Sequence, residues 1–144
     1  MSVRSGTAPR PVSAILAEAL EILLDDAPAA YFRVTRELDA CIVAIDLSEE
    51  HFRLRVNNDR AVMQGAADSN DHQTPTVSVH TSRQLIVDLI DGRRDVLSAF
   101  LSRDLSINAS LDAVIAASRA MTYFTEGAVR SRRMRCLADE LRAG

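Results

Sequence analysis

The segment 76–110 decides the fold, and it reads TVSVHTSRQLIVDLIDGRRDVLSAFLSRDLSINAS. Val77 and Val79 alternate with polar side chains, which is typical of a β-strand with one buried face. Ser82 can cap the helix that follows, and Gly92 can end it in the left-handed conformation that glycine adopts without strain. Residues 96–101 repeat the apolar spacing of this helix. The segment therefore predicts a strand and two short helices, and its end adds a further strand.

Two more helices are expected after that last strand. Ser110 can cap a longer helix, which we expect the Glu126-Gly127 pair to break. A basic helix follows at the C-terminus, with apolar residues spaced i, i+3 and i+7 at Met134, Leu137 and Leu141.

Before the segment, the pattern changes from helical to strand-like. Ser13 is placed to cap a helix over residues 13–24, whereas residues 29–39 fit helical and strand spacing and are left open. Residues 41–47 are apolar on both faces, which indicates a central strand. The next strands are expected at 52–56 and 61–66, joined by a turn at 57–59 and followed by a polar loop at 67–75.

Strands that are grouped together, with helices gathered around them, indicate the α+β class. We expect a mostly antiparallel sheet with helices covering one face. Residues 1–12 are predicted to be a flexible leader, 13–125 the domain itself, and 126–144 the C-terminal basic helix.

Composition narrows the possible functions. The chain has 144 residues, of which 47% are hydrophobic and 26% charged, and this is the composition of one globular domain. The net charge of −3 argues against nucleic acid as a partner. All the basic residues are arginines, which excludes catalysis by a Schiff-base or Walker-type lysine. We predict no transmembrane segment, and two cysteines without a disulfide framework favour a cytoplasmic protein.

Familiar catalytic motifs are missing from the sequence, and two polar clusters are the candidates for chemistry. Asp68, Asp71 and His72 could form a metal cluster, but their spacing is that of a solvated loop. The stretch 46–51, with Asp46 and His51, offers a carboxylate beside an imidazole and is equally typical of a turn. We therefore predict no catalytic residue, no metal and no cofactor.

The strongest local charge feature is a group of arginines near the C-terminus, at Arg130, Arg132, Arg133 and Arg135. It could attract phosphate, an anionic membrane surface or an acidic partner. A solvated helix face, balanced by nearby Asp139 and Glu140, explains the same pattern.

Residues 85–124 carry more apolar side chains than one small sheet readily covers. Either the helices pack tightly on the sheet, or they stand away from it and enclose an apolar cavity. The spacing of the residues does not decide between these two arrangements.

The order of elements resembles the sterol carrier protein type two family over roughly residues 13–125. Gly92 matches the glycine between the two short helices of that family, and Leu105 and Ile107 match the apolar pair of its late strand. The family usually has Gly-Lys before that strand and Gly-Asp after it, where this sequence has Arg103-Asp104 and Ala109-Ser110. These turns are therefore expected to differ in geometry.

The resemblance implies a five-stranded sheet and an apolar tunnel for a fatty acyl chain, a sterol or a similar lipid. It implies non-enzymatic binding or transfer of this hydrophobic molecule. By position, the residues that could line the tunnel are Leu89, Leu97, Phe100, Leu101, Val114, Ile115, Met121 and Phe124.

Two alternatives remain open. The same fold could have a core filled by its own side chains and serve as an interaction module, with the C-terminal helix docking on a second copy or a partner protein. The second alternative is a small isomerase or hydratase that uses Asp46 or His51 beside an apolar pocket.

Overall fold

A five-stranded sheet with the strand order β3-β2-β1-β4-β5 forms one layer of the structure, a computed structural model that describes residues 10–65 and 74–143. Its strands are β1 (Ile42–Asp46), β2 (His51–Asn57), β3 (Arg60–Gly65), β4 (Val77–His80) and β5 (Ser106–Asn108). β1 and β4 are parallel, and the other neighbouring strands are antiparallel. The predicted α+β class and mostly antiparallel sheet are thus confirmed.

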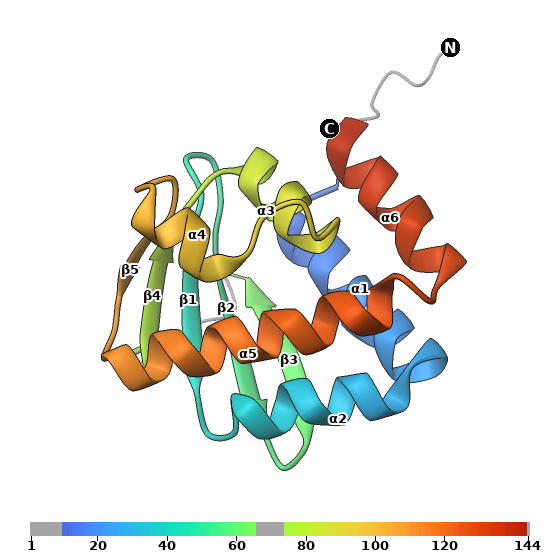
Figure 1. Ribbon diagram of the computed structural model, residues 1–144, viewed down its shortest axis with the longest axis horizontal. Helices are drawn as coiled ribbons and strands as arrows, with labels where there is room; N and C mark the ends of the chain where they lie inside the picture. Colours follow the sequence, from blue (N-terminus) through green and yellow to red (C-terminus); the bar gives the residue numbers. More distant parts are fainter. Residues whose placement is uncertain (1–9, 66–73, 144) are drawn as a thin grey trace.

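Helices form the second layer (Figure 1). They are α1 (Val12–Asp26), α2 (Pro28–Glu37), α3 (Arg83–Ile90), α4 (Val96–Leu101), α5 (Leu111–Ala128) and α6 (Arg132–Ala143). α2, α3, α4 and α5 lie in front of the sheet in this view, and α6 packs beside α1 and α3. None of these described helices combines the length and the hydropathy that crossing a bilayer requires.

Several local predictions are confirmed by the hydrogen bonds of the backbone. Ser82 Oγ accepts from Leu85 N at 3.2 Å, and Ser110 Oγ accepts from Ala113 N at 3.2 Å, so both serines cap their helices. Gly92 has a φ of +75°, the left-handed conformation expected after α3.

The start of α1 differs from the prediction that Ser13 caps it. The helix begins at Val12, which is 1% exposed, and its cap comes from the turn between β1 and β2. The carboxylate of Glu50 accepts from Val12 N at 2.8 Å and from Ser13 N at 2.9 Å. A carboxylate at this end also interacts favourably with the helix dipole, so a residue distant in sequence replaces the local cap.

The stretch left open at 29–39 is helical, because Pro28 starts α2 at a position where its missing N–H is not needed. One face of α2 is buried and includes Tyr31 and Val34. The Tyr31 hydroxyl accepts a hydrogen bond from Ala61 N at 3.0 Å and so ties α2 to β3.

The predicted break of the long helix at Glu126-Gly127 is wrong, because α5 continues to Ala128. Gly127 instead permits a close approach of helices. A Cβ placed on it would lie 2.7 Å from Ala30 Cβ and 2.7 Å from Leu23 Cδ1, on α2 and α1. Glycine thus serves packing here and not termination.

The apolar face of α6 is buried within this chain: Met134 is 2%, Leu137 4% and Leu141 0% exposed. The Arg133 guanidinium pairs with two carboxylates at the end of α1, with Nη1 3.3 Å from Asp26 Oδ1 and Nη2 3.6 Å from Asp25 Oδ2. The other arginines of the C-terminal cluster are exposed. The C-terminal helix therefore belongs to the same packed unit as α1.

Candidate binding site

An apolar cavity of about 210 Å³ lies between the sheet and the helices. Its walls come from β1 to β5 and from α1, α2, α3, α4 and α5. They consist of Leu16, Leu20, Val34, Leu38, Val43, Ile45, Leu54, Met63, Val77, Val79, Thr81, Ile86, Leu89, Ile90, Val96, Leu105, Ile107, Ala117, Ala120, Met121 and Phe124.

The strands contribute the residues that point to the helical side. Val43 and Ile45 in β1 alternate with Ala44 and Asp46, and only the first pair lines the cavity. The period-two pattern of the sequence thus divides the sheet into a cavity face and an outer face.

Of the eight residues expected to line a tunnel, three line this cavity: Leu89, Met121 and Phe124. Val114 is buried and Ile115 half-buried in α5, but neither borders it. The remaining three, Leu97, Phe100 and Leu101, lie on α4 and are 41%, 36% and 78% exposed.

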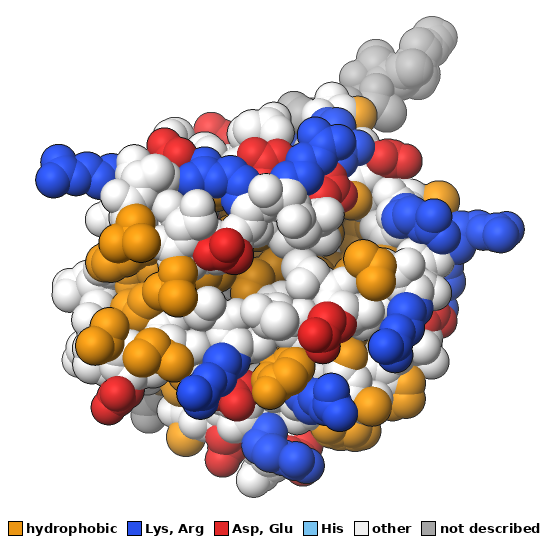
Figure 2. Space-filling view, viewed as in Figure 1, with side chains coloured by type: hydrophobic (Ala, Val, Ile, Leu, Met, Phe, Trp, Pro, Cys, Tyr) orange, Lys and Arg blue, Asp and Glu red, His pale blue; other side chains and the backbone are white. Residues whose placement is uncertain are grey.

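The exposed residues of α4 form part of the surface and not of the cavity wall. Figure 2 shows hydrophobic side chains gathered on the left of this face, over α4 and the beginning of α5. Leu111, at the first position of α5, is 72% exposed as well. Because α4 has only six residues, just Val96 and Ala99 are buried on its inner side.

Most residues of the cavity wall were not predicted from the sequence pattern. The contributions of α1, of α2 and of the end of α2, such as Leu16, Leu20, Val34 and the C-cap Leu38, carry no signal that separates a cavity wall from an ordinary core. The wall residues on the strands were recognisable from the sequence as inward-facing positions. Only the order of the strands in the sheet shows that they converge on a single cavity.

Thr81 is the one wall residue in the described part of the chain with a polar side chain. Its hydroxyl oxygen is shielded from solvent and has no hydrogen-bond partner there. Its backbone N donates to Asp46 O at 3.1 Å and so continues the pairing of β4 with β1.

A second hollow of about 150 Å³ opens on the surface next to the cavity. The turn between α3 and α4 and one side of α5 form it, with Arg93, Arg94 and Thr122 among its lining residues. Val96 and Met121 line both hollows. These two side chains therefore lie where the two hollows adjoin.

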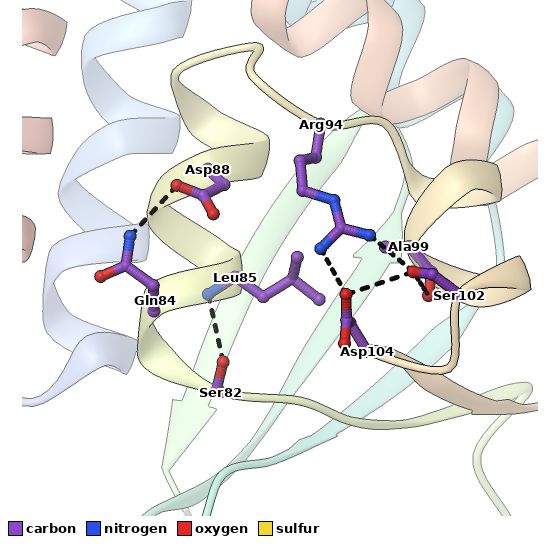
Figure 3. Close-up of polar contacts among 8 residues, drawn as sticks. All are labelled: Ser82, Gln84, Leu85, Asp88, Arg94, Ala99, Ser102 and Asp104. Atoms are coloured by element: carbon purple, nitrogen blue, oxygen red, sulfur yellow. Dashed lines mark hydrogen bonds and ion pairs between the residues drawn. The ribbon is translucent and has the colours of Figure 1, made fainter.

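A polar clamp fixes the turns at both ends of α4 (Figure 3). Arg94 donates to Asp104 Oδ2 at 2.6 Å and to Ser102 Oγ at 2.7 Å, and so bridges the residues before and after the helix. These contacts, with Arg94 the largest cause, lower the pKa of Asp104. Asp95 Oδ1 caps α4 by accepting from Ser98 N at 2.7 Å.

The candidate acid–base residues, Asp46 and His51, lie outside the apolar cavity. The Asp46 carboxylate contacts Nδ1 of both His51 and His80, at 2.9 Å for His80, on the outer face of the sheet. Both imidazoles are about two-thirds exposed, at 67% and 68%. The outward direction of Asp46 separates this cluster from the cavity. Glu50, from the same stretch, caps α1.

Within residues 10–65 and 74–143, no group of three or more His, Cys, Asp or Glu side chains is arranged so that it could hold a metal ion. The acidic loop residues Asp68, Asp71 and His72 lie outside the described residues, so the structure does not bear on them.

A larger hollow, of about 460 Å³, runs between α3, the end of α5 and α6, but it is charged. Both of its acids pair with Arg142, which contacts Asp91 and also Asp139, the latter at 2.8 Å. We therefore consider the apolar cavity the better candidate for binding.

Comparisons with solved structures place this fold among the sterol carrier proteins. The chain is similar to a UbiJ-SCP2 ubiquinone synthesis protein, with 13% identity and a TM-score of 0.61 over 81% of this chain and 90% of that one. It is similar to sterol carrier protein 2 from Yarrowia lipolytica in its apo form, with 14% identity and a TM-score of 0.57 over 79% and 92%.

A third similar structure is the sterol carrier protein domain 2 of Helicoverpa armigera, with 14% identity and a TM-score of 0.59 over 84% and 96%. No protein-family profile matches the sequence. No curated protein matches it either. Since the identities are low, the likeness shows the fold, and the predicted sterol carrier protein fold is confirmed.

Proposed function

We propose that this chain binds an apolar small molecule, such as a lipid chain, in the cavity between its sheet and its helices. The observation that carries the proposal is the cavity itself, which holds about 210 Å³ and is lined almost entirely by apolar side chains. Two of the similar structures are sterol carrier proteins by name, which supports the same class of ligand.

Binding would be driven by removing apolar surface from water, at about 0.8 kcal/mol for each buried methylene. Affinity should therefore rise with chain length until the cavity is full. We propose that Leu89, Met121 and Phe124 contact the ligand, and that it enters beside Val96 and Met121, which line both the cavity and the surface hollow.

Binding without catalysis agrees with the positions of the polar groups. The Asp46 carboxylate and the two imidazoles beside it face away from the cavity, so they could not act on a molecule inside it. The wall holds no charged side chain, and the proposed binding requires neither a metal nor a cofactor.

The alternative of an interaction module with a filled core has less support. The C-terminal helix was its expected docking surface, and the apolar residues of that helix are buried against α1 and α3 of the same chain. Those side chains are unavailable to a partner in this arrangement.

Displacement of a fluorescent fatty acid, followed by native mass spectrometry, tests the proposal. We expect one molecule bound per chain, and weaker binding in Ala120→Leu, which adds a larger side chain to the cavity wall. Val62→Ser is the control, because Val62 is 50% exposed and is not part of the wall. Absence of any adduct at micromolar ligand, or equal binding by both variants, would refute the proposal.

A further inference from the structure

A patch of exposed apolar side chains covers α4 and the start of α5. It consists of Leu97, Phe100, Leu101 and Leu111, which are 41%, 36%, 78% and 72% exposed, and we call it the α4 patch. Seven large hydrophobic side chains are exposed in the described part of the chain, and these four of them gather in one region (Figure 2). Single exposed hydrophobic residues are ordinary, whereas a contiguous group of them marks a surface that contacts a protein or a membrane.

The sequence of α4 makes this short helix apolar on two sides. Val96 and Ala99 are buried on its inner side. Leu97, Phe100 and Leu101 are spaced i, i+3 and i+4, so they share another side of the helix, which faces solvent. The inner side alone accounts for the packing of α4 on the protein. The outer apolar side therefore has no role in the fold of this chain.

The α4 patch lies on the outside of an element whose inner side borders the cavity. Val96, the first residue of α4, lines the cavity and also the surface hollow beside it. Leu105 and Ile107, in the chain that follows α4, line the cavity too. Whatever binds the α4 patch is thus brought close to the place where we propose that the ligand enters.

The charged groups around α4 leave one cation available. Asp95 caps α4, and Asp104 is held by Arg94, so both carboxylates are engaged within the chain. Arg103 follows α4 with a φ of +67°, is exposed, and has no side-chain partner among the described residues. Asp112 lies in the first turn of α5, where the helix dipole offsets part of its charge. An apolar surface with an arginine at its edge is complementary to a lipid surface, because the arginine can reach lipid phosphates.

We propose that the α4 patch docks on a lipid bilayer, and that the ligand passes between the bilayer and the cavity at this contact. The docking is independent of any ligand, whereas the passage of the ligand rests on the proposed function. Because the contact is apolar, the ligand would move from the acyl chains of the lipid to the cavity without crossing water.

A bilayer fits the α4 patch better than a protein partner does. Residues that anchor protein interfaces usually insert into well-packed pockets, and none of the three hollows described above is lined by a residue of the α4 patch. A bilayer requires no pocket, since leucine and phenylalanine side chains insert directly at the boundary between head groups and acyl chains.

Cosedimentation with phosphatidylcholine vesicles tests the docking. We expect the wild-type chain to bind, and the double variant with Leu101→Ser and Leu111→Ser to have a vesicle partition coefficient lower by about tenfold or more. The matched control carries Val62→Ser and Val129→Ser, at valines that are 50% and 65% exposed outside the α4 patch, and should bind like the wild type. Circular dichroism should show that both double variants are folded. Equal binding by the two double variants, or no binding by the wild type, would overturn the proposal.

Vesicles that also contain phosphatidylglycerol test the role of the arginine. We expect the anionic lipid to strengthen binding, and Arg103→Gln to reduce binding to these vesicles by about threefold to fivefold. The arginines of α6 are the competing candidate for this contact. If the combination of Arg132→Gln and Arg135→Gln abolishes binding while the leucine double variant binds normally, α6 is the membrane surface and the proposal is wrong.

Two further measurements identify what covers the α4 patch and separate the proposals. Analytical ultracentrifugation should show a monomer; a dimer that dissociates in the leucine double variant, without vesicle binding, would mean that a second copy covers the patch. The leucine double variant should still bind a fluorescent fatty acid in solution as the wild type does. If the wild type binds vesicles but no fatty acid, the proposed function fails and the docking stands.

Discussion

Replacing Ala120 by leucine tests whether the space between sheet and helices is hollow. Ala120 lies on α5, lines the cavity and is 3% exposed, so a larger side chain cannot turn toward solvent. Leucine adds three carbons, and burying them at about 0.8 kcal/mol each gives at most about 2.4 kcal/mol. The loss of side-chain freedom subtracts about 0.5–1 kcal/mol. Alanine and leucine are both good helix formers, so helix propensity changes little.

We therefore expect Ala120→Leu to raise the free energy of unfolding by about 1–2 kcal/mol, measured by urea denaturation monitored by circular dichroism. Gly127→Ala is the control on the same helix. Its new Cβ would meet Ala30 and Leu23 at 2.7 Å, so it should destabilise by about 1–3 kcal/mol in spite of the higher helix propensity of alanine. If Ala120→Leu also destabilises by 1 kcal/mol or more, the space is already filled and our reasoning is wrong.

Three further predictions concern single groups. Thr81→Val should raise the free energy of unfolding by about 1 kcal/mol without any ligand, because it removes a buried hydroxyl that has no hydrogen-bond partner among the described residues. Thr35→Val should lower the free energy of unfolding by about as much, because Thr35 is 0% exposed and its hydroxyl donates to Phe32 O at 3.2 Å. Thermal denaturation of the two variants measures both effects. Glu50→Ala should cost about 1–2 kcal/mol through loss of the cap on α1, and hydrogen exchange at Val12 and Ser13 should quicken; unchanged exchange there would contradict the cap. Burial, followed by the charge of Asp39, raises the pKa of the Cys41 thiol. At pH 8 a disulfide reagent should therefore modify the exposed Cys136 first and Cys41 only slowly, and the rate at Cys41 should rise as the pH increases toward that pKa. Equal rates of modification at pH 8 would count against this prediction.

Features that depend on neighbours in the sequence were predictable. The caps at Ser82 and Ser110 require only a hydroxyl at the right distance from a helical N–H, and the turn at Gly92 requires only a residue that tolerates a positive φ. The strands followed from their period-two pattern, because the alternation is fixed by the geometry of an extended chain.

The errors concern features that depend on residues far apart in the chain. Ser13 is a good capping residue, yet the cap of α1 is the carboxylate of Glu50, which only the folded chain brings there. Gly127 resembles a helix terminator locally, but the proximity of α1 and α2 requires a glycine within α5.

The candidate site was predictable only in part, for the same reason. Leu89 and Phe124 face inward, and an apolar pattern indicates as much. Leu97 and Leu101 show a similar pattern but lie on a short helix whose outer side stays exposed. Whether an apolar residue borders a cavity or a packed core depends on the distance between layers, and periodicity carries no information about that distance.

The central claim, that an apolar ligand occupies this cavity, is tested most directly through the methionine methyl groups. Met63 and Met121 line the cavity, whereas Met134 is 2% exposed in the packing of α6 and does not line it. The chain labelled with ¹³C at its methionine methyls should be titrated with octan-1-ol and followed by NMR. We predict that the Met63 and Met121 signals shift together to saturation while that of Met134 stays in place. Shifts of all three alike, or of none, would contradict the claim.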